Sequence, residues 1–563
     1  MSDVSTAELV QLADIEDVPW DTTVDVVVAG SGAAGWSAAI AAALQGSSVL
    51  VLEKESSIGG TTAKAGGGTD EIASTWFWIC NHPWLKELGI IESKDETLRY
   101  LSRLSRPELF NPDSRNLGLP QDEYELLVTF YDRGSEAIGA LSDCGALPLR
   151  PLEETLDYYA DLPENKTPKG RGLYFARNDG SEGTGADIVE SMKNVAVELG
   201  VQVRTSSPVR GVIVDEEGSV IGVSSGDRAA RMMLVRTLKG VVMATGGFTR
   251  DVELMRSHLR GPVLGGLASD GNSGDLVRIS GALGLDIANM NEAWYAPMVL
   301  DLAPYPVSAA FRLPGDSMIL VNRFGQRAVN EKTTYNEMTR SFFQWDSATA
   351  SYPNFPLVMI YDDSVSQRCR QMPGDAPVTD GGGNPLPRTP GEGHEIVAQT
   401  WDELAQKIDE KLSKFQNLLP GVKLSRDFSN GLAETISRWN TMSDSGIDED
   451  FARGGTSTER RRSGEARVND MPNPTMHGFA ETGPYYAVVL VPGTLDTKGG
   501  PRIDTSSRLL RSDGSFVPGL YGAGNCIASP AGQAYWAGGT TLGLAATFGW
   551  IAGQHAANRN ENS

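Results

Sequence analysis

The sequence predicts an α/β fold, in which a nucleotide-binding domain built on a parallel sheet is interrupted by an inserted α+β domain. Residues 24–29 (VDVVVA) form a short apolar run of the kind found in strands that are buried on both faces. A glycine-rich turn follows, then an alanine-rich helix at 36–44 and a second apolar run at 48–52. This strand–turn–helix–strand order is typical of a Rossmann-like unit. The pattern stops near residue 294 and returns near Pro484, which indicates the insertion.

The turn after the first strand has the spacing of a phosphate-binding loop. It reads GSGAAG at 30–35, and Glu53 ends the next strand. Gly30 permits the tight turn, Gly32 lets the backbone approach a pyrophosphate, and Gly35 allows the helix to pack closely on the strand. The helix N-terminus offers N–H groups and the positive end of its dipole to phosphate. We expect Glu53 to accept hydrogen bonds from an adenosine ribose.

Three further glycine-rich segments favour FAD over NAD as the dinucleotide. GGTT at 59–62 lies just after Glu53, where the longer phosphate–ribitol chain of a flavin needs more backbone donors. ATGG at 244–247 ends another predicted strand at 240–244, and GAGN at 522–525 forms a late loop that would reach the ribitol or the pyrophosphate. The order of these segments predicts a Rossmann-like FAD-binding domain of the GR2 type.

The predicted organisation has four segments. Residues 1–22 form a polar N-terminal extension. Residues 23–293 and 479–563 form the two parts of the FAD-binding domain, and residues 294–478 form the inserted substrate and catalytic domain. Within the insertion, the apolar spacing predicts a helix at 401–418.

Composition excludes several classes of function. The 563 residues carry a formal net charge of −23, whereas binding to nucleic acid needs a basic face. Four cysteines without CxxC spacing predict neither a zinc site nor a disulfide framework. The acidic N-terminus is unlike a signal peptide, and no apolar run reaches the roughly 18 residues of a spanning helix. We therefore expect a cytoplasmic protein with no metal and no transmembrane segment, and leave open an apolar patch that holds it peripherally at a membrane.

Several motifs resemble those of the fumarate-reductase-like flavoproteins and, within them, the 3-ketosteroid dehydrogenases. The shared motifs are GSGAAG (30–35), EK…GGTTAKAGG (53–67), ATGGF (244–248), NRFGQRAVNE (322–331), GPYYAVVLVPGTLDTKGG (483–500), GLYGAGN (519–525) and AYWAGGTTLGLAATFGWIAG (534–553). The cofactor-binding residues that the glycine pattern and the resemblance together imply are Gly30, Gly32, Ala33, Ala34, Gly35, Glu53, Lys54, Gly60, Thr61, Thr62, Gly66, Gly67, Ala244, Thr245, Gly246, Gly524, Asn525, Thr541 and Leu542.

Reaction chemistry selects the branch within this family. If the resemblance to fumarate reductases extended to function, histidine and arginine side chains would hold a dicarboxylate substrate. The segment 494–500 (TLDTKGG) lacks the histidine pair that those enzymes carry there. A dianionic substrate also fits poorly with a net charge of −23. The TKGG turn instead resembles the ketosteroid branch. For Lys498 itself we expect a turn or surface role.

The resemblance implies 1,2-dehydrogenation of a 3-keto-4-ene steroid to a 1,4-diene-3-one. Tyr535 stands four residues before Gly539, as in the family's Tyr-x-x-x-Gly motif, and its hydroxyl and the Gly539 N–H would hold the C3 carbonyl oxygen. Tyr335, which follows NEKTT, would take the C2 proton, and the flavin would take hydride from C1. Tyr158, slightly preferred to Tyr159, would assist the base.

The resemblance leaves alternatives open. A related 4-(5α)-dehydrogenase has a serine two positions after its tyrosine, where this chain has Ala537. A fumarate-type or enoate reductase would depend on an arginine such as Arg323, Arg327 or Arg502, and a non-catalytic flavin-binding protein is a third alternative. The inserted domain and the region 103–121 are longer than in a minimal member of the family, and this extra length would give room for sterols that keep a side chain, such as cholest-4-en-3-one. Besides the 3-ketosteroid, the enzyme would need an electron acceptor, which the sequence does not name.

Overall fold

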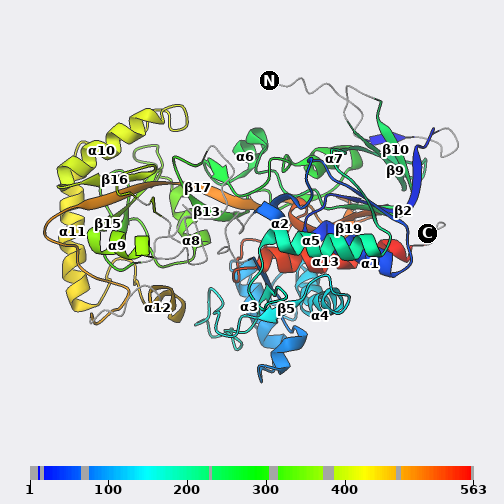
Figure 1. Ribbon diagram of the computed structural model, residues 1–563, viewed down its shortest axis with the longest axis horizontal. Coiled ribbons are helices and arrows are strands. Elements are labelled where there is room, and N and C mark those ends of the chain that lie inside the picture. The colour runs from blue at the N-terminus through cyan, green and yellow to red at the C-terminus, as the bar shows by residue number, and fades with distance from the viewer. Residues whose placement is uncertain are drawn as a thin grey trace.

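The glycine turn lies in a nine-stranded sheet, seen in the right half of Figure 1 in a computed structural model of the chain. The strand before the turn, β2 (Thr22–Ala29), pairs in parallel with β3 (Val49–Leu52) and with β10 (Met233–Met243). The paired ends of these strands are apolar and buried, as in parallel sheets that helices cover on both faces. The structure describes residues 10–12, 18–64, 75–226, 231–303, 315–371, 386–387, 389–464 and 471–559.

The path through this sheet runs β1-β8-β9-β10-β2-β3-β7, and β20 pairs in parallel with β10. β8, β9 and β10 form an antiparallel meander, with Gly218 in the turn between β8 and β9. The parallel strands therefore meet at one edge, where their carboxyl ends lead into the glycine-rich loops. The other strands of the sheet are β1 (Val10–Leu12), β7 (Gln202–Arg204), β8 (Val209–Val214), β9 (Val220–Ser225), β19 (Arg508–Leu510) and β20 (Phe516–Gly522).

Helices from both ends of the chain cover this sheet. α1 (Ala33–Leu44) begins within the glycine turn and packs against α5 (Gly185–Glu198) and α13 (Thr540–Ala557), the red helix in Figure 1. The contact between α1 and α13 is close, since a Cβ on Gly549 would lie 2.3 Å from the carbonyl oxygen of Ala34. The C-terminal segment therefore completes the domain that the N-terminal segment begins.

A second, six-stranded sheet carries most of the inserted segment. Its longest strand, β17 (Tyr485–Thr497), is antiparallel to β13 (Ala293–Val299) and to β15 (Leu357–Asp362). β17 begins in the left lobe of Figure 1 and ends near the first sheet. The other strands and the helices of this lobe are β11 (Gly265–Gly266), β14 (Met318–Val321), β16 (Glu395–Ala398), α8 (Tyr335–Arg340), α9 (Asp363–Gln371), α10 (Trp401–Lys414), α11 (Phe428–Ser445) and α12 (Ser457–Gly464).

The predicted domain boundaries at 294 and 478 stay a prediction. β13 begins next to the first of them, but β17 follows the second and still pairs with the inserted strands. We propose that the inserted unit ends with β17, because the backbone hydrogen bonds of that strand belong to the second sheet.

A smaller lobe at the bottom of Figure 1 lies under the end of α13 that faces the second sheet. Its sheet has the order β4-β6-β5, and Trp78 of β4 stacks on Phe130 of α4 and lies against Trp536. This lobe therefore supports the loop that precedes α13. The elements of the lobe and the remaining short elements are β4 (Trp76–Trp78), β5 (Leu149–Pro151), β6 (Gly172–Phe175), α3 (Lys94–Ser105), α4 (Gln121–Asp143), α2 (Gly60–Lys64), α6 (Val252–His258), α7 (Asp275–Leu283), β12 (Ile287–Ala288), β18 (Gly500–Pro501), and the 3₁₀ turns η1 (Pro83–Lys86), η2 (Ser341–Phe343) and η3 (Gly524–Cys526).

Two predictions concern helices: the helix at 401–418 and the absence of a membrane-spanning helix. The helix predicted at 401–418 begins at the predicted residue, where the Thr400 side chain caps it, but it ends four residues early, at Lys414. The apolar spacing continues past the end because Leu418 and Leu419 still pack inward. Among the residues that the structure describes, no helix is both long and apolar enough to cross a bilayer.

Candidate functional site

A cavity of about 250 Å³ lies where the first sheet, the second sheet and the smaller lobe meet. Glycine-rich segments that are far apart in the sequence line it together, as the parallel-sheet edge requires. The predicted site residues that line it are Gly30, Gly32, Ala33, Ala34, Glu53, Lys54, Gly60, Thr61, Thr62, Ala244, Thr245, Gly246, Tyr335, Gly524, Asn525, Tyr535, Gly539, Thr541 and Leu542.

Four predicted site residues are not part of this lining. Gly66 and Gly67 lie outside the described residues. Gly35 faces the turn instead of the cavity, and a Cβ on it would lie 2.0 Å from the carbonyl oxygen of Gly30. Gly35 therefore serves packing, as the pattern predicts, and makes no contact of its own with the cavity. The fourth, Tyr158, lies behind two lining residues and is described below.

The glycine turn leaves room for a ligand at the N-terminus of α1. Gly30 has φ of +105°, and a Cβ on it would lie 2.3 Å from the carbonyl oxygen of Ala244, so no larger residue fits. Gly32 is the N-cap of α1 and supplies no side-chain acceptor, and the first turn of the helix has no acidic residue. The helix itself therefore places no acidic side chain at the positive end of its dipole; the Ala33 N–H donates to the Thr62 hydroxyl at 3.0 Å, and the turn lines the cavity.

Glu53 and Lys54 lie at the end of β3 on the same cavity. The Glu53 carboxylate accepts hydrogen bonds from the backbone N–H groups of Ser31 at 3.1 Å and Glu55 at 2.8 Å. The Lys54 ammonium pairs with Asp275 at 3.0 Å. Glu53 is thus held in place by the turn, and it keeps acceptor sites for a hydroxyl group.

Asp496, near the end of β17, is the centre of a buried polar wall of the cavity. Its carboxylate accepts hydrogen bonds from the Gly247 N–H at 3.0 Å and from the side-chain amides of Asn272 at 2.6 Å and Asn525 at 3.1 Å. Burial raises the pKa of Asp496, and the donors at Gly247 and Asn525 act in the opposite direction. Asn525 therefore ties the loop after β20 to the end of β17.

Two tyrosine hydroxyls meet at the cavity. The Tyr335 hydroxyl donates a hydrogen bond to the Tyr535 hydroxyl at 2.7 Å. Tyr335 is the first residue of α8, which Thr334 caps, and Tyr535 lies in the loop just before α13. Both side chains are buried and both line the cavity. The fold thus brings together two residues that the sequence separates by 200 positions.

Gly539 is the N-cap of α13 and lies four residues after Tyr535. Its φ is +94°, and a Cβ on it would lie 2.7 Å from the carbonyl carbon of Phe77, so only glycine fits without displacing β4. Its carbonyl oxygen accepts from the Trp78 N–H at 3.1 Å. Among the described residues, its N–H group has no hydrogen-bond acceptor. This N–H lies at the positive end of a helix and is available to a ligand.

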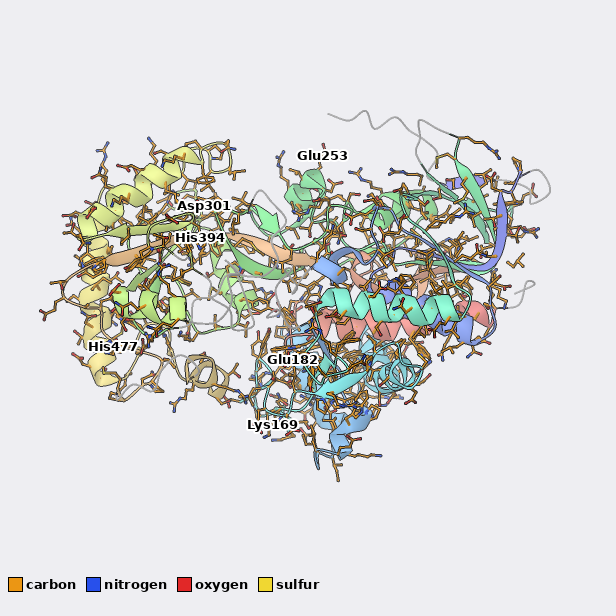
Figure 2. The ribbon with its side chains drawn as sticks, viewed as in Figure 1. Lys169, Glu182, Glu253, Asp301, His394 and His477 are labelled. Carbon is orange, nitrogen blue, oxygen red and sulfur yellow. The ribbon has the colours of Figure 1, made fainter. Side chains whose placement is uncertain are left out.

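Trp76 and Gly538 form the part of the cavity wall next to these groups. A Cβ on Gly538 would lie 3.1 Å from the Trp76 ring, so the indole packs directly on the backbone. The Trp76 Nε1 donates to Glu182 at 3.3 Å, and Figure 2 labels this glutamate close to the meeting point of the lobes. The wall is therefore flat and apolar, which suits a ring-shaped ligand.

Tyr158 and Tyr159 point to different surroundings. The Tyr158 ring packs edge-on against Tyr335 and Tyr535, with centroids 5.9 Å and 5.4 Å away. Tyr159 instead faces Glu337, and burial together with that carboxylate raises the pKa of Tyr159. Of the two tyrosines that the sequence left open, Tyr158 is the one beside the hydroxyl pair.

A buried polar network anchors Tyr158. The neighbouring Asp157 accepts a hydrogen bond from the Trp78 Nε1 at 2.7 Å and pairs with Arg171. The Tyr158 N–H donates to the Trp536 carbonyl at 2.9 Å, which links the segment to the loop of Tyr535. The contacts of Asp157 and of the Tyr158 N–H thus fix the backbone that carries the Tyr158 ring.

Comparison with known proteins identifies the family. The sequence profile of the FAD binding domain family matches residues 25–542, nearly the whole chain. The chain belongs to the FAD binding domain family. The family resemblance predicted from the glycine motifs is therefore confirmed, and FAD is the cofactor.

Individual relatives of this FAD-binding chain span almost its full length. It is 31% identical to the 4-oxocyclohexanecarboxylate 2-dehydrogenase of Sinomonas cyclohexanicum, over 96% of this chain and 93% of the relative. It is 29% identical to the 3-oxosteroid 1-dehydrogenase of Mycolicibacterium smegmatis, over 94% and 96%. Its fold matches the crystal structure of the 3-ketosteroid delta1-dehydrogenase of Sterolibacterium denitrificans with a TM-score of 0.76 at 24% identity, covering 95% of this chain and 99% of the other. The predicted fold class is thereby confirmed.

The cavity residues fit FAD. The glycine turn and the N-terminus of α1 would hold the diphosphate, and Glu53 would hold a ribose. The Thr541 hydroxyl lines the cavity and is a buried polar atom with no partner among the described residues, as expected for a group that bonds a ligand. Leu267 and Leu542 line the same cavity and supply apolar surface for an aromatic ring system. When bound, FAD would accept a hydride from a substrate in this cavity.

Sequence reasoning missed some residues of the site and misjudged another. Asp496 and Asn272 line the cavity, and the acid within the apolar strand 485–497 was a signal for the first. Lys498 was expected in a turn or surface role, but its side chain is completely buried. Residues 498–499 link β17 to β18 and are both buried, and no turn is assigned to them. Among the described residues, no cluster of three or more His, Cys, Asp or Glu side chains could hold a metal ion.

Proposed function

We propose that this FAD-binding protein dehydrogenates a ring ketone next to its carbonyl group, and that the substrate is a 3-ketosteroid, desaturated between C1 and C2. The observation that carries the proposal is the contact between the Tyr335 and Tyr535 hydroxyls on the cofactor cavity, which Gly539 also lines. A carbonyl oxygen needs donors where negative charge develops, and the neighbouring C–H needs a base. This constellation supplies both.

Each residue has a distinct task in the proposed reaction. The Tyr535 hydroxyl and the Gly539 N–H would donate hydrogen bonds to the C3 carbonyl oxygen and stabilise enolate charge. Stabilisation of that charge makes the C2 hydrogens more acidic, and Tyr335, in its deprotonated phenolate form, would accept one of them as a proton and become a neutral phenol. Tyr158 would hold the Tyr335 ring in place through edge-on packing. The hydride from C1 goes to the bound flavin.

The relatives support a ring ketone as the substrate class. One relative is a 3-oxosteroid 1-dehydrogenase, and another is a 4-oxocyclohexanecarboxylate 2-dehydrogenase. Both names describe dehydrogenation of a ring that carries an oxo group. The smaller ketone is our second candidate substrate, because the identity to that relative, 31%, is slightly higher than the 29% to the steroid enzyme. A sterol with a side chain, such as cholest-4-en-3-one, is included within the first candidate.

The cavity gives less support to the reductase and 4-(5α)-dehydrogenase alternatives. Arg323, Arg327 and Arg502 do not line the cavity; Arg327 is paired with Glu331, and Arg502 with Asp122. A reductase that clamps an anionic substrate would need an available cation there, and the Lys54 ammonium that lines the cavity is already paired with Asp275. Ala537, which is buried, stands where the 4-(5α)-dehydrogenase resemblance implies a serine.

The test is anaerobic reduction of the purified yellow holoenzyme by three ketones: androst-4-ene-3,17-dione, cholest-4-en-3-one and 4-oxocyclohexanecarboxylate. We expect a steroid to bleach the visible flavin band and to yield a 1,4-diene-3-one by mass spectrometry. Bleaching by the carboxylated cyclohexanone alone would move the substrate to the second candidate. If none of the three reduces the flavin, the proposed reaction is wrong.

A further inference from the structure

Lys498 lies buried beneath the loop that carries Tyr535. Its Nζ donates hydrogen bonds to the carbonyl oxygens of Ala534 at 2.7 Å and Gln533 at 3.3 Å. Its side chain is 0% exposed. Loop residues 531–539 form no strand or helix, so no backbone ladder fixes the position of Tyr535. The ammonium therefore supplies hydrogen bonds that secondary structure does not.

Lys498 also lies on the tryptophan that packs against Tyr535. Its Nζ is 3.9 Å from the centroid of the Trp294 ring, and the ring is edge-on to Tyr535 with centroids 5.0 Å apart. The Trp294 Nε1 donates to the Asn525 side chain at 3.1 Å, which in turn donates to Asp496. The indole is thus held by a cation on its face and by a hydrogen bond at its edge.

The charged groups around Lys498 do not explain its burial by a stabilising ion pair. Glu292, Glu337, Arg340 and Arg106 act on it electrostatically, but among the described residues no carboxylate lies within ion-pair distance of its Nζ. Burial lowers the pKa of Lys498 to about 7, Arg340 and Arg106 act in the same direction, and the two glutamates oppose them. A buried cation without a direct counter-ion destabilises a fold. Its retention next to a reactive tyrosine therefore needs another reason.

We propose that Lys498 is a positioning residue for Tyr535, which holds the backbone at 533–534 and clamps Trp294 against the phenol ring. The inference rests on the proposed function, in which the Tyr535 hydroxyl polarises a ketone. Misplacement of such a donor by an ångström lowers the rate of the chemical step much more than it weakens ground-state binding. Lys498 does not line the cofactor cavity, so it acts on Tyr535 only through the neighbours named above.

The test compares two lysine-to-methionine variants as FAD-loaded holoenzymes. Lys498→Met keeps the apolar stem and removes the donors. Lys411→Met is the control, because Lys411 is also mostly buried and donates to the His394 carbonyl and Asp301, which Figure 2 labels in the upper left, away from the cavity. With the ketone that reduces the wild type, we expect Lys498→Met to lower kcat by about tenfold or more while KM changes less than about threefold. Lys411→Met should leave both unchanged.

Hydrogen exchange gives a second readout that needs no turnover. In Lys498→Met, the backbone amides of 531–539 should exchange faster, while those of α10 keep the wild-type rate. If Lys498→Met does not yield holoenzyme, Lys498→Gln, which keeps a donor, should show smaller changes in the same directions. If kcat and the amide exchange rates of the Lys498 variants equal those of the wild type, the inference is wrong. A wild type that oxidises no ketone would refute the proposed function, and the exchange data would still decide the role of Lys498.

Discussion

At the scale of single residues, the site depends on one contact between two hydroxyl groups. Tyr335 and Tyr535 are buried, and their oxygens lie 2.7 Å apart. Their rings pack edge-on with Tyr158 and with each other. The packing fixes the rings, so the loss of a hydroxyl alone should change chemistry without changing the fold.

Tyr535→Phe therefore tests the donor role. The variant keeps the ring contact with Trp294 but loses the hydroxyl, and we expect kcat to fall about 10²- to 10³-fold, as for the loss of an oxyanion-hole donor. Steady-state kinetics and the thermal midpoint Tm of the holoenzyme check this. Tyr159→Phe is the matched control, since Tyr159 faces Glu337, and it should retain most of the activity. Full activity in Tyr535→Phe would mean that another group polarises the ketone.

Lys498 gives the stability of the protein a defined pH dependence. Its pKa is about 7 in the folded chain against 10.5 for an ordinary lysine. Between these values the unfolded chain binds more protons than the folded one, so this group makes the free energy of unfolding rise with pH. Lys498→Met removes that rise. The stability of the variant relative to the wild type should be highest near pH 6 and should decrease toward about pH 9, by an amount on the order of a few kcal/mol. Urea unfolding at both pH values measures it, and a pH-independent difference would contradict the buried charge.

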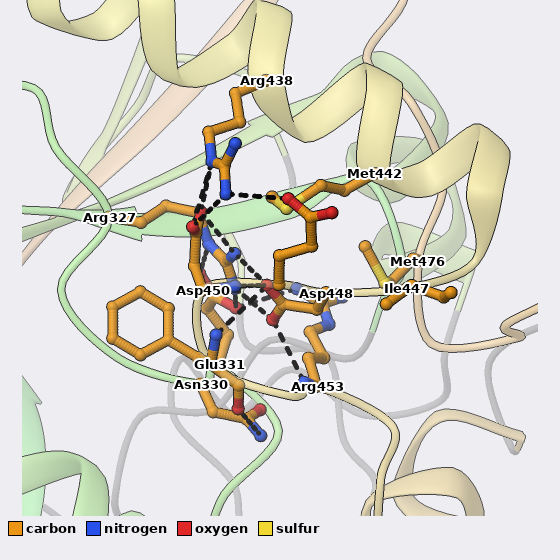
Figure 3. A network of polar contacts seen from close by, with 12 residues as sticks. Arg327, Asn330, Glu331, Arg438, Met442, Ile447, Asp448, Asp450, Arg453 and Met476 are labelled. Atoms are coloured by element: carbon orange, nitrogen blue, oxygen red, sulfur yellow. Dashed lines mark hydrogen bonds and ion pairs between the residues drawn. The ribbon is translucent and has the colours of Figure 1, made fainter.

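At the scale of elements, a buried ion network holds the segment that leads into α8 (Figure 3). Glu331 pairs with Arg327 and with Arg453, and Arg327 also pairs with Asp448 in the loop after α11. Burial acts to raise the pKa of Glu331, but the two arginines outweigh it and hold the pKa below its ordinary value. Tyr335 lies four residues after Glu331, so the network orients the start of its helix.

Glu331→Gln should destabilise this segment strongly. Two buried guanidinium groups would lose a shared carboxylate, and breaking such a pair costs about 3–5 kcal/mol. The comparison is Arg438→Ala in the same network, where the guanidinium is 51% exposed and pairs with Asp450. That change should cost no more than about 1 kcal/mol. Equal decreases of Tm in the two variants would show that the stabilisation by an ion pair of this network does not depend on its burial.

Elements with a local sequence signal were predictable, and contacts between distant elements were not. The run 24–29 and the start of α10 follow from local composition and capping, which act over a few residues. The burial of Lys498 follows from how β17 enters the middle of the molecule, a feature with no local signal. The motif resemblance nominated Tyr335 and Tyr535, but only the packed structure shows that their hydroxyls touch.

At the scale of the whole molecule, the cofactor cavity joins three lobes. The first sheet supplies the glycine turn, β17 brings Asp496 from the second sheet, and β4 brings Trp76 from the smaller lobe. The order of glycine motifs predicted the interruption of the first domain. It did not predict that β17 links the second sheet to the cavity, because strand pairing is a non-local property.

A cavity shared by three lobes predicts strong coupling between FAD and folding. FAD binds the assembled cavity, so free FAD at about 100 times its Kd should stabilise the folded state by about 2.7 kcal/mol. Thermal unfolding of protein stripped of flavin, with and without added FAD, measures this as a rise in Tm. Gly30→Ala should abolish the rise, since its Cβ would collide with the Ala244 carbonyl. A Tm that does not respond to FAD would contradict the shared site.

The most direct test of the central claim is a single anaerobic turnover of androst-4-ene-3,17-dione that carries deuterium at C1. The proposed reaction predicts that the flavin is reduced more slowly than with unlabelled steroid, and that the product is a 1,4-diene-3-one that has lost one C1 deuterium. Tyr535→Phe should slow the same step. Reduction of the flavin with all C1 deuterium retained, or no reduction at all, would show that the tyrosine pair does not serve desaturation between C1 and C2.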